Sequence, residues 1–287
     1  MNSRLALGTV QFGLPYGVAN QTGQVSRDDA TTILDHAWTM GLDTLDTAIA
    51  YGESEQRLGE IGVGRWRIIS KLPAMPESCP DISGWVRKSV SDSLERLKVN
   101  RLCGLLLHRP QQLLGEKGYA LYKVLDDLKQ LGVVGKIGIS IYDPQELEAL
   151  ISSYRFDLVQ APFNVLDRRL MTSNWLTKLK QAGTEVHARS VFLQGLMLMN
   201  ATNRPARFQK WQPLWDKWHE WLIERELSPL QACLGFVLAH AEIDRVIVGV
   251  DTLAQLQEVL STVKVSPNPP VELNCEDADL INPSRWS

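Results

Sequence analysis

The stretch Leu42–Gly52, which reads LDTLDTAIAYG, decides the fold that we expect for this chain. It runs from a short apolar strand into an acidic residue, Asp46, and places a phenol, Tyr51, five positions later. The next two apolar strands each end on one titratable side chain, Lys71 and His108. In a β/α barrel, the carboxyl ends of the strands surround one mouth, which holds the active site. The stretch therefore predicts that these four side chains meet in one cleft.

Outside this stretch, strand-like apolar runs alternate with amphipathic segments along most of the chain. The predicted strands are Arg4–Leu7, Thr44–Asp46, Arg67–Lys71, Leu102–His108, Lys136–Ser140, Leu158–Ala161, Glu185–Arg189 and Val246–Val250. The predicted helices are Arg27–Met40, Ser54–Ile61, Ile82–Leu97, Tyr119–Leu131, Pro144–Ser153, Leu170–Gln181, Trp211–Arg225, Pro229–His240 and Leu253–Val263. Asp143-Pro144 and Ser228-Pro229 are each expected to start a helix, and Gly41, Gly132 and Gly183 to follow helix ends.

Eight strand–helix units predict an α/β protein, a (β/α)8 TIM barrel formed by one domain over residues 1–287. Pro229–His240 is then an extra helix before the last strand. A doubly wound sheet is the alternative. It would be favoured by a G-x-G-x-x-G motif after a strand, and the sequence contains none.

The composition excludes several classes of function. The formal net charge of −3 gives no electrostatic reason to expect nucleic acid or an anionic membrane as a partner. No apolar run approaches the roughly 20 residues of a membrane-spanning helix, and the N-terminal residues are too polar for a signal peptide. Cys103 and Cys233 lie in apolar segments and no C-x-x-C motif is present. We therefore expect a cytoplasmic protein.

The four polar strand ends suit acid–base chemistry. An isolated tyrosine has a pKa of about 10, and an adjacent ammonium from Lys71 is expected to lower the pKa of Tyr51. Asp46 would keep Lys71 charged, and His108 could either donate a hydrogen bond to a carbonyl oxygen of the substrate or relay a proton through Tyr51. Taken one at a time, these residues could instead be a helix cap, a loop aromatic, a surface lysine and a loop histidine. Their position at successive strand ends favours a shared site.

The motif Asp46-Thr47-Ala48-x-x-Tyr51-Gly52, followed by Lys71 and His108 at the next strand ends, resembles the aldo-keto reductase superfamily over about Leu7–Leu260. The resemblance implies an NAD(P)H-dependent oxidoreductase that reduces the aldehyde or ketone group of a small molecule. The short loop after His108 and the short tail suit an open pocket for a polar or sugar-like carbonyl compound. The resemblance further implies that Tyr51 is the general acid, that Lys71 and His108 give electrostatic support, and that no metal takes part. Two other functions stay open: a nucleotide-binding regulatory subunit of the same fold, and a barrel isomerase or lyase.

The resemblance also implies a cofactor site for NADP or NAD. Ser140 and Gln160 match the residues that hold the nicotinamide carboxamide, and Glu258 matches an acidic residue near the adenine. The complete set of implied cofactor residues is Thr9, Ser140, Gln160, Arg189, Ser190, Gly249, Asp251, Thr252, Gln255 and Glu258.

The chain departs from the family pattern at three places. Ile141 stands where an asparagine is usual. Arg189 replaces an aromatic that stacks on nicotinamide, and structural salt bridging is the alternative role for it. The segment Gly249–Gln255 has no lysine or arginine for the 2′-phosphate of NADP, which leaves that site in doubt. Asp251 is expected either to accept hydroxyls of a ribose or to cap the following helix.

Two aromatic features allow more than one interpretation. Trp211, Trp215, Trp218 and Leu222 form a stripe at helical spacing, which favours packing against the barrel over an aromatic substrate wall. Leu14–Gly17 and Trp286 are expected either to wall the mouth or to cover the barrel.

Overall fold

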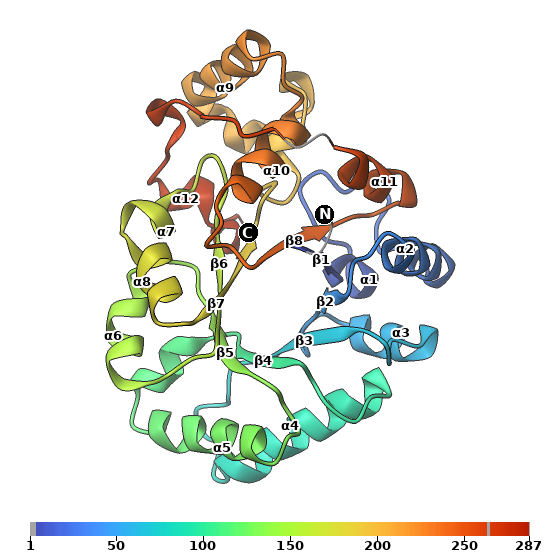
Figure 1. The fold of residues 1–287 in the computed structure, drawn as a ribbon, viewed down its shortest axis with the longest axis vertical. Helices are drawn as coiled ribbons and strands as arrows, with labels where there is room; N and C mark the ends of the chain where they lie inside the picture. Colours follow the sequence, from blue (N-terminus) through green and yellow to red (C-terminus); the bar gives the residue numbers. More distant parts are fainter. Residues whose placement is uncertain (1–3, 263–264, 287) are drawn as a thin grey trace.

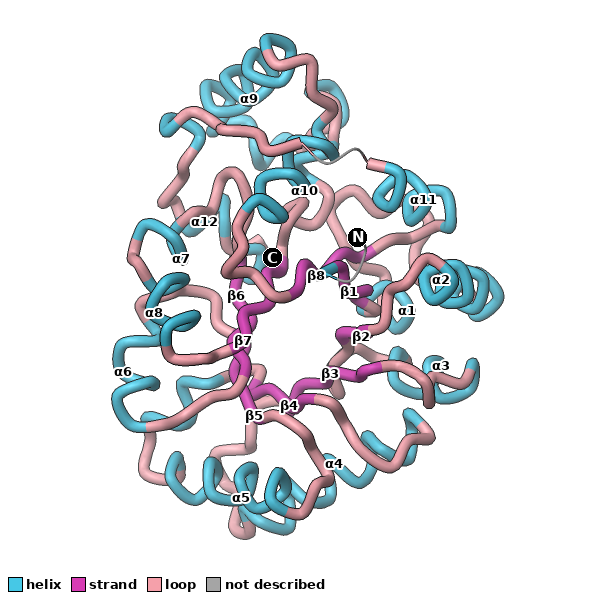
Figure 2. The backbone as a smooth tube through the Cα atoms, viewed as in Figure 1, coloured by secondary structure: helices cyan, strands magenta, loops and turns pink. Residues whose placement is uncertain are grey.

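In a computed structural model of the protein, which describes residues 4–262 and 265–286, eight parallel strands close into a barrel in chain order. The ring closes because β1 pairs with β8 as well as with β2 (Figure 2). The strands are β1 (Leu5–Gly8), β2 (Thr44–Asp46), β3 (Arg67–Leu72), β4 (Gly104–Leu107), β5 (Ile137–Ser140), β6 (Leu158–Pro162), β7 (Glu185–Arg189) and β8 (Arg245–Gly249). The predicted TIM barrel is confirmed, and a doubly wound sheet is excluded by this closure.

Helices surround the strand ring on its outer side (Figure 1). The α-helices are α1 (Val10–Gly13), α2 (Arg27–Thr39), α3 (Ser54–Ile61), α4 (Ile82–Leu97), α5 (Gly118–Gln130), α6 (Glu146–Ser153), α7 (Arg169–Thr172), α8 (Trp175–Gln181), α9 (Gln212–Glu224), α10 (Pro229–Ala239), α11 (Leu253–Ser261) and α12 (Ala278–Ile281). The short 3-10 helices are η2 (Pro110–Leu114), η3 (Leu196–Leu198), η4 (Ala201–Asn203), η5 (Ala206–Trp211), η6 (Val271–Leu273) and η7 (Pro283–Arg285). Helix α10 is the predicted extra helix before the last strand. None of the described helices is long and apolar enough to cross a membrane.

Most predicted helix boundaries are confirmed within two residues. Ser228 caps α10 in a reciprocal capping box with Gln231, and Gly41, Gly132 and Gly183 all adopt positive φ. Such a capping box satisfies two backbone N–H groups that would otherwise lack partners.

Three predicted boundaries need comment. The segment predicted as one helix, Leu170–Gln181, is two helices, because Asn174 adopts a left-handed conformation with φ 63°. Helix α6 begins at Glu146 instead of Pro144, since the Asp143 carboxylate accepts from the backbone N–H of Gln145 and holds a turn there. The predicted last residue of α11, Val263, lies outside the described residues.

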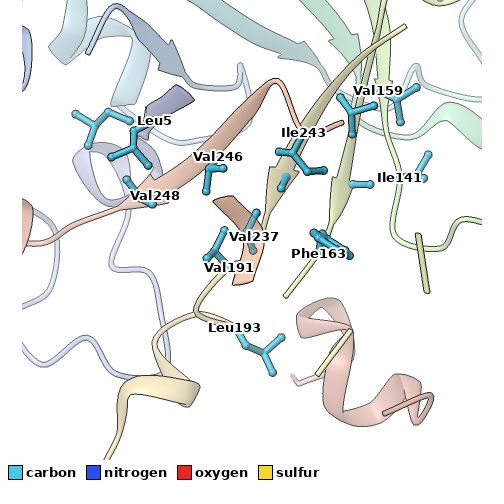
Figure 3. Packing of buried hydrophobic residues seen from close by; sticks show 14 of the residues in the cluster. Leu5, Ile141, Val159, Phe163, Val191, Leu193, Val237, Ile243, Val246 and Val248 are labelled. Atoms are coloured by element: carbon cyan, nitrogen blue, oxygen red, sulfur yellow. The ribbon is translucent and has the colours of Figure 1, made fainter. Parts of the chain in front are cut away.

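The hydrophobic core lies mainly between the strands and the surrounding helices. Figure 3 shows one part of it, where Val246 and Val248 of β8 lie near Val237 of α10. Inside the barrel a second, small cluster of Ile69, Leu106 and Leu158 fills the middle. Burying one such side chain stabilises the fold by about 1.5–3 kcal/mol. This small apolar cluster leaves the carboxyl ends of the strands free for polar side chains.

A buried carboxylate holds α3 in place, directly after the turn that carries Tyr51. Glu55 accepts from the hydroxyls of Ser70 and Ser93 at 2.6 and 2.7 Å. The guanidinium of Arg96 donates two further hydrogen bonds to it at 3.0 and 2.7 Å. With this many donors, a buried charge can be retained at little cost. The network ties α3 to β3 and α4, and so fixes the segment that follows Tyr51.

His187 on β7 is buried in the barrel, with its Nε2 2.8 Å from Glu185. Burial lowers the pKa of His187 to about 3. The unfolded chain therefore binds this proton below about pH 6.5, whereas the folded chain does not. We expect the free energy of unfolding to fall as pH decreases from about 6.5 to 3, at up to about 1.4 kcal/mol per pH unit for this group.

Urea denaturation of wild type and His187→Gln at several pH values tests this expectation. Glutamine can still donate to Glu185 but does not titrate. The variant should show a shallower acid-side slope, and equal slopes in the two proteins would contradict the assignment.

Candidate active site

The barrel brings together the four predicted catalytic side chains. Asp46 ends β2, Lys71 lies on β3, and His108 follows β4. The Nζ atom of Lys71 lies 2.6 Å from Oδ1 of Asp46 and 5.0 Å from the centre of the Tyr51 ring. The rings of Tyr51 and His108 meet edge to face, with their centroids 5.8 Å apart. The four groups therefore form one cluster at the carboxyl end of the barrel.

Close packing of the backbone fixes the turn that carries Tyr51. A Cβ atom on Gly13 would lie 1.8 Å from the carbonyl oxygen of Tyr51, so α1 can approach this turn only through a glycine. The hydroxyl of Ser54 donates to the carbonyl oxygen of Thr9 and lies 3.1 Å from the hydroxyl of Thr47. These contacts position the phenol before any ligand arrives.

Asp46 and Lys71 form a buried ion pair, and both carboxylate oxygens of Asp46 accept a hydrogen bond. Burial lowers the pKa of Lys71, and Asp46 opposes this change through its charge and its hydrogen bond. Lys71 also donates to the carbonyl oxygen of Thr47, at 2.9 Å. The second carboxylate oxygen of Asp46 accepts from the amide of Gln160, at 2.7 Å.

The predicted direction of the Tyr51 pKa shift is wrong. Burial of the phenol, followed by the charge of Asp46, raises the pKa of Tyr51, and Arg189 opposes this only in part. Tyr51 is therefore protonated at neutral pH and has a proton to give. The sequence interpretation counted the nearby ammonium of Lys71 but could not count the enclosure of the ring.

His108 is held in its neutral form. Burial, and then the positive charges of Lys71, Arg189 and Arg109, lower its pKa to about 3. A neutral imidazole carries one N–H donor and one acceptor. His108 can therefore donate a hydrogen bond to an uncharged oxygen without adding a charge to the site.

A cavity of about 480 Å³ opens from the catalytic cluster and runs toward β8 and α11. This volume lies in the range of small-molecule and cofactor sites. Tyr51 and His108 lie at one end of its lining, and Asp251, Gln255 and Glu258 come from the loop after β8 and from α11. The other predicted cofactor residues in its lining are Thr9, Ser140, Gln160, Arg189, Ser190 and Gly249.

The predicted amide-binding pair, Ser140 and Gln160, lies next to Asp46. The Ser140 hydroxyl is 3.3 Å from Oε1 of Gln160, whose Nε2 is bound to Asp46. Ile141, at the position of the usual asparagine, is buried and donates its backbone N–H to the carbonyl oxygen of Gln160. The hydroxyl of Thr9 is also engaged, since it donates to the carbonyl oxygen of Asp46 at 3.0 Å.

Arg189 makes no salt bridge with any carboxylate in the described ranges, so its alternative structural role is wrong. Its guanidinium donates to the carbonyl oxygen of Ile141 at 2.8 Å and to the hydroxyl of Ser190 at 3.1 Å. Its carbon Cζ lies 4.4 Å from the centre of the Tyr142 ring. Arg189 thus lines the cavity as a cation whose orientation these contacts fix.

The loop after β8 shows that one of the two roles expected for Asp251, that of helix cap, is wrong. Thr252, not Asp251, caps α11, because its hydroxyl accepts from the backbone N–H of Gln255. Thr252 is absent from the described lining of the cavity. The Asp251 carboxylate accepts from the side-chain amide of Asn20 at 3.1 Å. Burial raises the pKa of Asp251, and the Asn20 hydrogen bond opposes this shift.

Sequence reasoning missed Gln11. It is 91% buried, it lines the cavity, and its Oε1 has no hydrogen-bond partner in the described structure. A Cβ atom on Gly249 would lie 2.4 Å from its Nε2, so the glycine leaves room for this amide. No spacing or motif distinguishes this glutamine in the sequence.

Sequence reasoning also missed Tyr142, Asn20 and Gln194 in the cavity lining. Tyr16, from the segment expected to wall the mouth, does line the cavity, and Gln194 donates to its hydroxyl at 3.2 Å. The sequence gives little indication that Tyr142, Asn20 and Gln194 line a cavity, because each lies on a loop whose course the sequence does not determine.

The tryptophan stripe and Trp286 serve packing. Trp215 and Trp218 are fully buried on α9, which contacts η5 and η6 outside the strand ring (Figure 1). Packing is therefore confirmed over an aromatic substrate wall, because no residue of the stripe belongs to the described cavity lining, and the barrel as its packing partner stays a prediction. Trp286 packs edge to face on Phe208, away from the described cavity lining.

Comparison with known proteins agrees with this geometry. The chain is 27% identical over 297 aligned positions to D-threo-aldose 1-dehydrogenase of Pseudomonas sp, covering 88% of this chain and 89% of that protein. It is 26% identical to L-galactose dehydrogenase of Arabidopsis thaliana, with 91% and 86% covered. The holo form of aldo-keto reductase AKR11C1 from Bacillus halodurans has the same fold, with a TM-score of 0.71, 20% identity, and coverage of 92% and 88%.

The model of the Aldo/keto reductase family matches residues 4–272, a range that includes the barrel and the whole catalytic cluster. Since that match spans nearly the whole chain, and the four clustered side chains lie where the family motif placed them, the chain belongs to the aldo/keto reductase family of oxidoreductases.

Proposed function

We propose that this protein is an NAD(P)H-dependent carbonyl reductase with Tyr51 as its general acid. The observation that supports the proposal most strongly is the buried Lys71–Asp46 pair, whose ammonium lies 5.0 Å from the centre of the Tyr51 ring. A protonated phenol and a neutral imidazole would thus face the cavity, with the buried ammonium of Lys71 beside the phenol ring.

The residues account for proton donation in reduction. A reduced nicotinamide, when bound, would supply a hydride to the carbonyl carbon of the substrate. His108 orients the carbonyl oxygen with an N–H donor, and Tyr51 gives its proton to that oxygen as negative charge develops on it. The ammonium of Lys71 stabilises the phenolate that remains, and Asp46 keeps Lys71 in place.

The cavity suits such a cofactor. Its lining includes the hydroxyl of Ser140 and the amide of Gln160. It also includes polar side chains from the loop after β8 and from α11, namely Asp251, Gln255 and Glu258. The unpaired, buried Oε1 of Gln11 needs a donor, which a hydroxyl of a ribose would supply. Ser140, Gln160 and Gln11 would thus hold the nicotinamide half, and Asp251 with Glu258 the adenosine half.

The substrate class is suggested by the relatives. The two named above are sugar dehydrogenases, and a mouth lined by Tyr16, Tyr142 and Arg189 offers polar groups to a hydroxylated carbonyl compound. We propose that sugar-like aldehydes are among the substrates.

The first experiment follows absorbance at 340 nm while the purified protein is mixed with NADH or NADPH and a panel of aldehydes and ketones. Turnover supports the proposal. Cofactor binding without turnover would favour a nucleotide-binding regulatory protein, and no cofactor binding would favour an isomerase or lyase.

A related prediction concerns cofactor choice. No cation lies on Gly249–Gln255, and the Asp251 carboxylate there would repel a 2′-phosphate. We expect wild type to bind NADH at least as tightly as NADPH. Asp251→Arg should shift the preference toward NADPH by up to about 1.5–3 kcal/mol, because a guanidinium can make charged hydrogen bonds to phosphate.

Dissociation constants from the fluorescence of bound NADH and NADPH measure this shift. Asn20→Ala is the control, because it removes the partner of Asp251 and keeps the carboxylate. Much tighter binding of NADPH by wild type, or unchanged selectivity in Asp251→Arg, would contradict the prediction.

A further inference from the structure

Two guanidinium groups lie around the ring of Tyr142: that of Arg189 lines the cavity, whereas that of Arg109 is exposed and lies outside the described cavity lining. The Cζ atom of Arg189 is 4.4 Å, and that of Arg109 is 5.7 Å, from the centre of the Tyr142 ring. Both charges act on His108, on the neighbouring strand end. We call Arg109, Tyr142 and Arg189 the arginine pair site.

The nearby carboxylates do not neutralise this site. Asp143 and Asp167 both pair with Arg169, each at 2.8 Å, and Asp46 is bound by Lys71 and Gln160. Among residues 4–262 and 265–286, neither Arg109 nor Arg189 forms a salt bridge. Arg189 therefore brings to the cavity lining a positive charge with which no carboxylate of the described residues pairs directly.

The guanidinium of Arg189 is preorganised and still has free donors. Hydrogen bonds to the Ile141 carbonyl oxygen and the Ser190 hydroxyl, together with the Tyr142 ring, fix its plane. A guanidinium carries five N–H donors in a rigid fork that fits an oxyanion. Since these contacts use only part of the fork, the remaining donors can bind a ligand without paying to order the side chain.

We propose that the arginine pair site binds a carboxylate of the substrate, so that the preferred substrates are acidic aldehydes or ketones such as open-chain sugar acids. This inference rests on the proposed reductase function and deepens it. Arg189, His108 and Tyr51 line the same cavity, so a substrate whose carboxylate binds Arg189 could bring a carbonyl group of the same molecule to His108 and Tyr51. Opposite charge also draws such substrates into the cavity.

The test compares substrates that differ in charge but not in shape. Reduction of D-glucuronate is measured against D-glucuronamide, and succinic semialdehyde against its amide, at low ionic strength. We expect kcat/KM to favour the carboxylate in each pair by at least about tenfold, as for a charged hydrogen bond. Added salt should reduce this ratio if the attraction is electrostatic.

Arg189→Met should lower the carboxylate-to-amide ratio of kcat/KM by about tenfold or more. Because both substrates of a pair are measured on the same variant, general effects of the substitution, including effects on cofactor binding, cancel in this ratio. Arg155→Met is the matched control, since Arg155 is exposed and makes no side-chain hydrogen bond or ion pair in the described structure. It changes the net charge equally and should keep the wild-type ratio.

Each result decides the question. Equal kcat/KM for carboxylate and amide in wild type would overturn this inference and leave the reductase function intact. An Arg189→Met variant with altered relative affinity for NAD⁺ and NADH but an unchanged substrate ratio would assign Arg189 to the cofactor. Cofactor binding without reduction of any aldehyde would overturn the reductase function, and this inference with it.

Discussion

Replacing Tyr51 with phenylalanine is expected to lower kcat for carbonyl reduction by at least about 100-fold, the loss typical of removing a general acid. The substitution keeps the ring that packs against His108, at 5.8 Å between centroids, and removes only the proton. Because Tyr51 acts on the reacting oxygen, the dissociation constant of NADH should change by less than about threefold. Stopped-flow reduction and NADH fluorescence titration measure the two quantities.

Tyr16→Phe is the matched control for this experiment. Tyr16 is another phenol in the cavity lining, and burial raises its pKa too, but its hydroxyl is engaged with Gln194. We expect a loss in kcat of less than about tenfold for this variant. Near-wild-type turnover by Tyr51→Phe, or equal losses in both variants, would show that Tyr51 is not the acid.

Lys71→Met is expected to lower both activity and stability. Removing the lysine leaves the Asp46 carboxylate buried without its cation, which costs about 3–5 kcal/mol of folding free energy in comparable sites. It also removes the charge that stabilises the Tyr51 phenolate, so the apparent pKa in the pH–rate profile should rise. Urea denaturation and the pH–rate profile measure the two effects separately.

The double variant Asp46→Asn/Lys71→Met tests whether the pair acts as a unit. With both charges gone, we expect it to be more stable than Lys71→Met alone, and the losses in kcat to be far from additive. Lys88→Met is the control, because the Lys88–Asp92 pair is exposed and should contribute less than about 1 kcal/mol. Independent, additive effects at Asp46 and Lys71 would refute the coupled site.

The sequence was sufficient to predict the barrel and the proximity of Asp46, Tyr51, Lys71 and His108, whose catalytic roles stay a prediction. Strand periodicity depends on local residue order, and parallel strands in a barrel bring their carboxyl ends together whatever the loops do. Asp46, Lys71 and His108 each follow from a strand end, and Tyr51 from a short turn after one.

The parts that the sequence did not predict depend on loop paths and enclosure. The direction of the Tyr51 pKa shift is set by burial of the phenol in the folded chain. The choice of Thr252 over Asp251 as the cap of α11 depends on backbone angles that either residue could adopt. Gln11 faces the cavity because Gly249 leaves space for it, and a contact between residues so far apart in the chain has no local signal.

The Asp46 carboxylate has consequences for how this protein can change. One of its oxygens is bound by Lys71 and the other by Gln160, so the proposed proton-donating and cofactor sides of the cavity share a single residue. A substitution of Asp46 removes a buried partner from both Lys71 and Gln160, and a substitution of either of those two leaves one oxygen of Asp46 without its partner. Single mutational steps away from this arrangement therefore pass through poorly folded intermediates. Redesign of the chemistry will need concerted replacement of all three, whereas the arginine pair site at the mouth can vary one residue at a time.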